Sequence, residues 1–113
     1  MINFHEHKLW QESYVALMDI HTALDAVEVD DRDCDVVKEL VESAQTVAAT
    51  VADSLTRQDR RVAQELMRTA VGQVAMTRTH LAVAWGRGLV DDGTFEALDA
   101  KYAALSSSLQ SSR

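Results

Sequence analysis

The sequence contains no proline, and three of its four glycines, Gly86, Gly88 and Gly93, fall within eight positions of one another. Because proline and glycine are the residues that most often interrupt regular structure, a chain with so few of them can form long, unbroken helices. Aromatic residues make up only 5% of the chain, so its core has to be built from small side chains on closely approaching helices. These absences favour an all-α protein.

Long apolar runs are also missing. No stretch has the ~20 consecutive apolar residues of a membrane-spanning helix, and the first residues lack the basic start and apolar middle of a signal peptide. The only cysteine, Cys34, has no partner for an internal disulfide, which is typical of proteins in reducing compartments. We therefore expect a cytoplasmic protein with no membrane partner.

The net charge of −7 argues against a protein covered with nucleic-acid contacts. The charge is uneven, however. Residues 57–87 contain six arginines against two acidic residues, a local charge of +4 that leaves −11 for the rest of the chain. One basic helix on an acidic body is the expected distribution.

At 113 residues the chain is expected to form one domain, residues 1–113. Four segments repeat apolar residues at intervals of three and four, the spacing of a helix with one buried face. The expected inward positions are Trp10, Tyr14, Leu17, His21 and Leu24 in the first segment, Val37, Leu40, Ala44, Val47, Val51 and Leu55 in the second, Leu66, Ala70, Val74, Leu81 and Trp85 in the third, and Phe95, Leu98, Tyr102 and Leu105 in the fourth.

Capping residues suggest the helix boundaries. Gly88 is a natural left-handed stop for the third helix, and Asp91 is the expected N-cap of the fourth. Between the second and third helices three readings stay open: a capping box of Thr56 with Asp59, a cap by Asp59 alone, or a continuous helix through 54–60. The polar residues 106–113 are expected to fray. Short connections then predict an antiparallel up-down-up-down four-helix bundle.

Three stretches resemble the small four-helix bundle proteins encoded in intervening sequences of 23S ribosomal RNA genes, to which the accessory proteins of diversity-generating retroelements are structurally akin. They are the Leu-Trp-Gln at 9–11, the alanine-rich 44–53, and Ala-Val-Gly-Gln-Val at 70–74 followed by Gly-Leu-Val-Asp at 88–91. The resemblance covers about residues 9–105. The sequence departs from the family pattern where Ala48 replaces a usual proline and Thr50 a usual asparagine.

This resemblance implies a non-enzymatic bundle that assembles into ring-shaped homo-oligomers, often pentamers. It also implies, from the retroelement relatives, a basic surface that binds a reverse transcriptase and nucleic acid. Arg57 matches an arginine of the family, and Arg60 and Arg61 stand at positions that are often lysine.

Metal and catalytic sites are not expected. Asp31, Asp33, Asp35 and Glu42 have the spacing of a calcium loop, but Val36 occupies the position that needs glycine, so we assign these acids to capping and solubility. His5 and His7 lack further ligands for zinc. A phosphotransfer module acting through His80 or His21 is a remote alternative. With no grouping of a nucleophile and a base, we expect no enzyme, no cofactor and no small-molecule substrate.

The candidate functional residues are therefore of two kinds. Exposed charge runs are often only a solvated face, yet the arginines of the third helix could dock RNA, DNA or an acidic partner protein: Arg57, Arg60, Arg61, Arg68 and Arg78. Trp10, Trp85 and Leu89 exceed what one small bundle needs to bury and are candidates for a homo-oligomer interface. The sequence favours a homo-oligomeric scaffold or adaptor, with a nucleic-acid-associated accessory protein as the alternative.

Overall fold

The computed structural model describes residues 3–28 and 34–112. Within them a short 3-10 helix, η1 (Phe4–Glu6), precedes four α-helices. The α-helices are α1 (Lys8–Leu24), α2 (Asp35–Thr56), α3 (Arg60–Gly86) and α4 (Asp92–Ser111).

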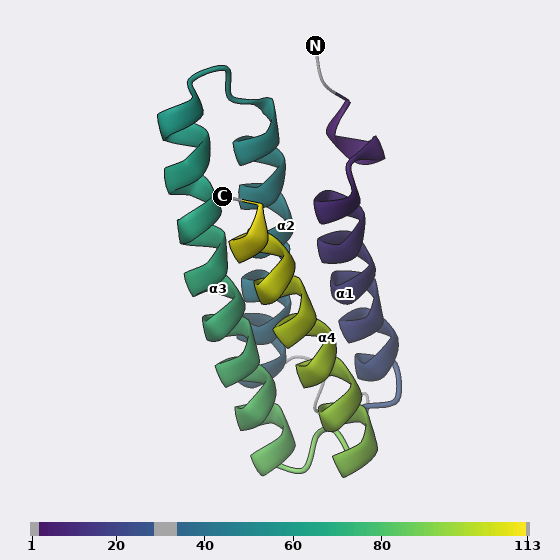
Figure 1. Cartoon of the computed structure of the whole chain (residues 1–113). Helices are drawn as coiled ribbons and strands as arrows, with labels where there is room; N and C mark the ends of the chain where they lie inside the picture. The colour runs from purple at the N-terminus through teal and green to yellow at the C-terminus, as the bar shows by residue number, and fades with distance from the viewer. Residues whose placement is uncertain (1–2, 29–33, 113) are drawn as a thin grey trace.

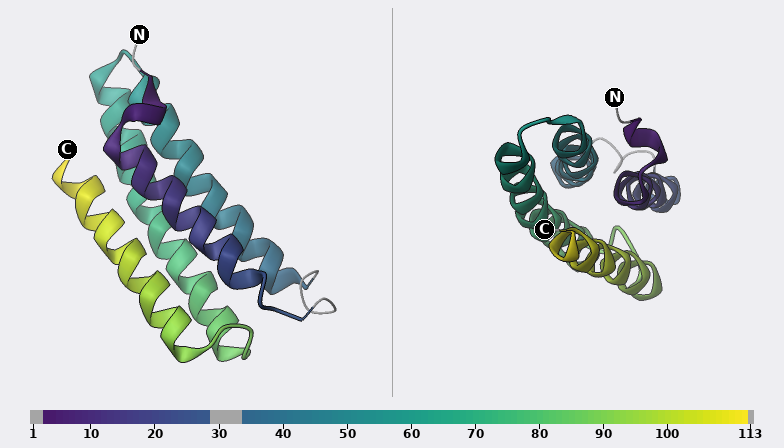
Figure 2. Two further views of the ribbon diagram at one scale, coloured as in Figure 1. Left: turned by 90° about the vertical axis from the view of Figure 1, so that its right-hand side faces the viewer. Right: turned by 45° about the horizontal axis from the view of Figure 1, so that its top comes forward.

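The four helices form an antiparallel bundle in which each helix runs opposite to the one before it (Figure 1). The bundle is elongated, with extents of 45 × 21 × 21 Å. Each helix packs mainly against two neighbours, so α1 and α3 lie diagonally across the bundle (Figure 2). Of the four contacts between neighbouring helices, the one between α2 and α3 is the most extensive and the one between α1 and α4 the least extensive. The predicted fold class is confirmed.

The connection between α2 and α3 resolves the three readings of the sequence. The side chain of Asp59 accepts hydrogen bonds from the backbone N–H groups of Arg61 (2.9 Å) and Val62 (3.3 Å), so Asp59 alone caps α3. The hydroxyl of Thr56 instead donates back to the carbonyl of Ala52 within α2 (3.1 Å). The capping box and the continuous helix are therefore wrong, because residues 57–59 separate the two helices.

The turn between α3 and α4 follows the sequence prediction. Gly88 has a φ of +78°, a left-handed conformation that glycine adopts without steric cost. The carboxylate of Asp91 then accepts a hydrogen bond from the backbone N–H of Thr94 at 2.7 Å. This bond lowers the pKa of Asp91, because it stabilises the ionised carboxylate.

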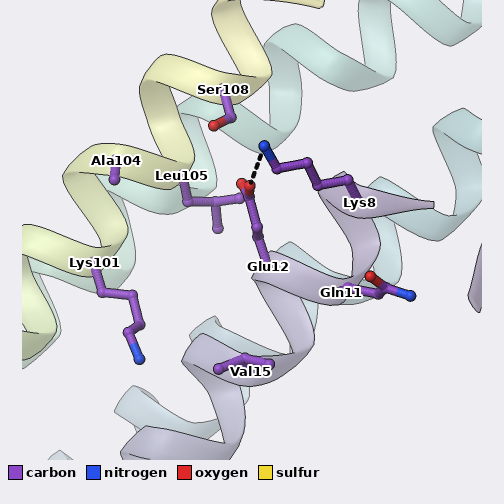
Figure 3. Close-up of a pocket in the computed structure, with 8 residues that line it drawn as sticks. All are labelled: Lys8, Gln11, Glu12, Val15, Lys101, Ala104, Leu105 and Ser108. Carbon is purple, nitrogen blue, oxygen red and sulfur yellow. Dashed lines mark ion pairs between the residues drawn. The ribbon is translucent and has the colours of Figure 1, made fainter. Parts of the chain in front are cut away.

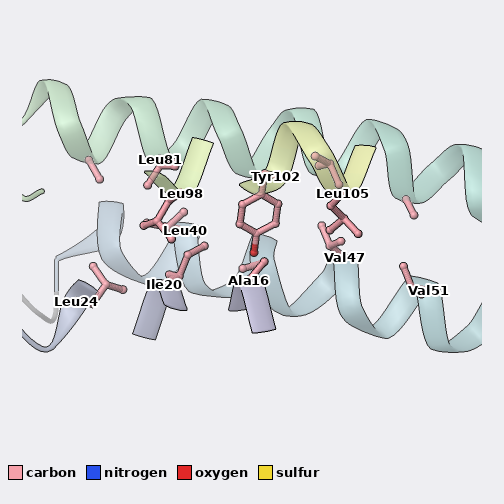
Figure 4. Packing of buried hydrophobic residues seen from close by; sticks show 14 of the residues in the cluster. Ala16, Ile20, Leu24, Leu40, Val47, Val51, Leu81, Leu98, Tyr102 and Leu105 are labelled. Atoms are coloured by element: carbon pink, nitrogen blue, oxygen red, sulfur yellow. The ribbon is translucent and has the colours of Figure 1, made fainter. Parts of the chain in front are cut away.

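The core runs the length of the bundle and is built mainly from Val, Leu and Ala, with one aromatic ring at its centre (Figure 4). Tyr102 of α4 is fully buried and its hydroxyl points toward Ala16 of α1 (Figure 4). No residue that the structure describes offers this hydroxyl a hydrogen bond. Burial raises the pKa of Tyr102 well above its usual value, with a smaller contribution from the charge of Asp19.

The predicted inward face of α1 is confirmed at Leu24 and holds only in part elsewhere, because the buried line is shifted by about one residue. The buried residues are Leu9, Ser13, Ala16, Ile20 and Leu24. Tyr14 is 43% exposed, while Trp10, Leu17 and His21 are half-buried at the side of the helix. Both stripes have three-and-four spacing, so the pattern alone favoured the larger side chains. Ser13 and Ala16 are fully buried, and the small Ala16 leaves room for the hydroxyl end of the Tyr102 ring.

The ends of α3 and α4 also differ from the prediction. Leu66 is only half-buried and Trp85 is 42% exposed; the inner face of α3 instead includes Met67, Thr77 and Ala84. The frayed tail expected at 106–113 is helical as far as Ser111, because Leu109 is fully buried in the core and anchors the last turns. The tail is otherwise polar, so its composition did not predict that one residue, Leu109, anchors it in the core.

Candidate interaction surfaces

The basic surface is smaller than the sequence suggested. Arg57 lies in the α2–α3 connection, outside the helix that carries the other arginines. Its guanidinium bonds both carboxylate oxygens of Asp53, at 2.7 and 3.3 Å, and this pair raises the pKa of Arg57. Much of its charge is thereby compensated locally, although the pair is half-exposed.

Arg78 lies away from the other arginines. It reaches from α3 to Asp99 of α4 and forms two hydrogen bonds, of 2.7 and 3.1 Å, with that carboxylate. The bond holds the pKa of Asp99 below its usual value and raises that of Arg78. This bidentate geometry fixes the register of α3 on α4, so Arg78 acts as a structural bridge.

Arg60, Arg61 and Arg68 remain. All three are exposed on the first three turns of α3, and none forms an ion pair with a residue that the structure describes. Three free guanidinium groups form a modest cationic surface beside the α2–α3 connection. Of the predicted nucleic-acid site, they are the arginines without a carboxylate partner among the described residues.

The three predicted interface residues do not come together. Trp10 lies near the start of α1 and Trp85 near the end of α3, at opposite ends of the bundle (Figure 1). Trp10 stacks on Tyr14 with ring centroids 5.0 Å apart, and it meets the rings of Phe4 and His5 edge-on. This aromatic cluster holds η1 on the end of α1.

Trp85 is largely engaged within its own chain. Its ring stacks on Phe95 at 4.5 Å, and its indole N–H donates to Asp92 at 2.7 Å. Leu89 is half-buried and packs against the core. Both residues therefore help to close the α3–α4 turn, a role that their position in the sequence did not reveal.

Large apolar side chains are exposed on two opposite faces instead. On α1 they are Tyr14, Val15 and Met18, each 42–48% exposed. On α3 they are Met76, 57% exposed, and Val83, 44% exposed, besides Trp85 at the end of the helix. Val15 lines a groove between α1 and α4 and Met76 a pocket between α2 and α3, so the two groups lie on opposite sides of the bundle.

A groove of about 310 Å³ lies between α1 and α4, the two neighbouring helices with the least extensive contact (Figure 3). Val15, Ala104 and Leu105 give it an apolar lining. Lys8 pairs with Glu12 at 3.7 Å on one side of the groove, and Lys101 pairs with Asp19 of α1 at the other. Both lysines are thus already occupied by carboxylates.

Two of the histidines singled out in the sequence have local partners. His7 caps α1 by accepting a hydrogen bond from Leu9 N–H (3.1 Å), and His80 lies 3.8 Å from the carboxylate of Glu39. Asp31 and Asp33 of the calcium hypothesis lie outside the described residues, whereas Asp35 begins α2 and Glu42 is exposed on it. Among residues 3–28 and 34–112, no three His, Cys, Asp or Glu side chains are grouped as metal ligands.

None of the described helices is long and apolar enough to cross a membrane. No model of a known protein family matches the chain, and no curated protein matches it at a significant level. The resemblance to the intervening-sequence proteins therefore stays a prediction.

Proposed function

We propose that this chain is a non-catalytic cytoplasmic scaffold or adaptor that works as a homo-oligomer. The observation that carries the proposal is the placement of large apolar side chains on the outer faces of α1 and α3. Met76 and the side chains of Tyr14, Val15, Met18 and Val83 are each between 42 and 57% exposed. Groups of exposed large apolar side chains are found at protein–protein contacts.

The packing of the bundle supports the same proposal. The core is closed by apolar side chains along its whole length, so the outer residues are not needed to complete it. The α3–α4 turn and the start of α1 are fixed by a cap and by aromatic contacts. An elongated bundle with two apolar faces suits a scaffold.

Sedimentation equilibrium from low micromolar to near-millimolar concentration tests the proposal. We expect an average mass that rises with concentration above the 12.5 kDa of one chain. A constant mass of one chain over the whole range would overturn it. The pentameric ring implied by the family resemblance corresponds to a limiting mass of five chains.

Nucleic-acid binding is the second candidate, because Arg60, Arg61 and Arg68 are exposed without ion-pair partners among the described residues. It is the weaker one, since the negative charge of the whole chain opposes approach to a phosphate backbone. Mobility-shift assays with generic RNA and DNA at low salt test it. No shift, or a shift that survives charge reversal of Arg60 and Arg61, would remove this candidate.

A further inference from the structure

The outward face of α3 carries no charge over most of its length. Between Thr69 and Gly86 the exposed residues of the helix are all uncharged. They are Thr69, Gly72, Ala75, Met76, Thr79, Val83, Trp85 and Gly86. At 1.5 Å per residue this face is roughly 26 Å long, in a chain of which 26% is charged. We call the line of Thr69, Gly72, Met76, Thr79 and Val83 the outer seam.

The outer seam has the spacing of a helix–helix contact. Its members follow one another at intervals of three, four, three and four residues. The buried seam of the same helix, which includes Met67, Ala70, Val74 and Leu81, has the same spacing. α3 thus carries two lines of residues suited to packing against another helix, and only the inner one is covered by its own chain.

The charges that bound the outer seam are arranged symmetrically about Met76. Glu65 precedes Met76 by eleven residues, and Arg87 follows it by eleven. Eleven residues are close to three helical turns, so both charges lie near the line of the outer seam, about 16 Å on either side of its centre. Both side chains are exposed, and neither forms an ion pair with a residue that the structure describes.

We propose that two copies of the chain pair through the outer seams of α3, antiparallel about a two-fold axis near Met76. This places Glu65 of each copy opposite Arg87 of the other, at both ends of the contact. A parallel pair would instead set like charges against each other at both ends, which disfavours it. The proposal rests on the proposed homo-oligomer and names the contact that forms it.

The sizes of the side chains fit the same arrangement. Met76 and Val83 project from the seam, whereas Gly72 and Thr79 beside them are small. The two Met76 side chains can therefore meet at the axis, while the small residues on either side let the two helices approach closely. Two turns from the axis, Thr69 of one copy faces Val83 of its partner. On the α2 side the face is bounded by Glu39 and Glu42, which limits the contact to α3.

Substitution of Met76 by lysine tests the contact. Met76→Lys puts two like charges together at the axis, and Met76 is so exposed that the monomer fold tolerates the change. Met18→Lys on α1 makes the same change on the opposite face and is the matched control. In sedimentation equilibrium we expect Met76→Lys to weaken association at least tenfold and Met18→Lys to leave it unchanged.

A charge swap tests the orientation. Glu65→Arg alone and Arg87→Glu alone each place like charges opposite one another and should weaken the dimer severalfold. The double variant restores opposite charges at both ends and should recover wild-type association. A double variant as weak as the sum of its single changes would overturn the antiparallel register.

The outcomes also separate this inference from the broader proposal. A limiting mass of two chains, lost with Met76→Lys, supports both. An oligomer that tolerates Met76→Lys, or that dissociates with Met18→Lys, overturns the pairing through α3 and leaves the homo-oligomeric scaffold standing. A monomer at every concentration overturns both.

Discussion

At the scale of the residue, burial was predicted less well than helical periodicity. Tyr102 was placed on the inner face of its helix from spacing alone, and it is fully buried. Spacing within α1 could not predict which of its residues are buried, because the Tyr102 ring that packs against α1 belongs to α4. The small residues Ser13 and Ala16 are buried, whereas the three-and-four pattern of α1 predicted the larger Tyr14 and Leu17 at the inward positions. Such compensation between distant residues leaves no local signal in a single sequence.

Tyr102→Phe is expected to stabilise the protein by about 1 kcal/mol, because it removes a buried hydroxyl that has no partner among the described residues. Urea denaturation at neutral pH measures the change. Tyr14→Phe, on an exposed ring, is the control and should have little effect. Clear destabilisation by Tyr102→Phe would show that the hydroxyl is satisfied.

The same tyrosine predicts a pH dependence. Its folded-state pKa is raised, so above a pH of about 10 the unfolded chain loses a proton that the folded chain keeps. Ionisation of Tyr102 therefore leaves the free energy of unfolding unchanged below that pH and lowers it as the pH rises further. In denaturation experiments at alkaline pH, Tyr102→Phe should lose less stability than the wild type; parallel losses in both proteins would contradict this.

At the scale of the element, starts and stops were predicted where one residue decides them. Gly88 and Asp91 end α3 and begin α4 as their chemistry requires. The end of α4 was missed because its anchor, Leu109, stands alone among serines and a glutamine. The α3–α4 bridge of Arg78 and Asp99 was missed for a related reason: these residues are 21 positions apart, and only the packed structure brings them together.

Leu109→Ala is expected to cost about 2–4 kcal/mol, because it leaves a cavity at a fully buried site. Helicity should also fall, since the last turns of α4 lose their anchor. Ser107→Ala, on the exposed side of the same turns, is the control. Circular dichroism during urea titration reports both quantities. An unchanged midpoint for Leu109→Ala would contradict the anchoring role of Leu109 and favour the frayed tail expected from the sequence.

Gly88→Ala is expected to destabilise the bundle by about 1 kcal/mol, because an alanine side chain is strained at a φ of +78°. Space is not the cause, since no atom outside the local chain lies within 4 Å of the added carbon. Gly93→Ala, in the first turn of α4 with ordinary contacts, should be neutral or slightly stabilising. Equal thermal midpoints for the two variants would contradict the left-handed stop.

At the scale of the whole molecule, the fold class was predictable and the functional surface only in part. Absent prolines and four three-and-four patterns were enough for an antiparallel bundle. The basic helix was also visible, but the neutralisation of Arg57 by Asp53 and of Arg78 by Asp99 depends on side-chain geometry. The outer seam of α3 was not predicted, because two lines of uncharged residues on one helix can be told apart only when the core is known.

Nuclear magnetic resonance of the wild-type chain at increasing concentration tests the central claim most directly, since it needs no substitution. We expect the backbone ¹H–¹⁵N signals of Thr69, Gly72, Met76, Thr79 and Val83 to shift progressively, while those of Tyr14, Val15 and Met18 stay in place. Concentration-dependent shifts on α1 with a silent α3, or no shifts on either helix, would contradict the account.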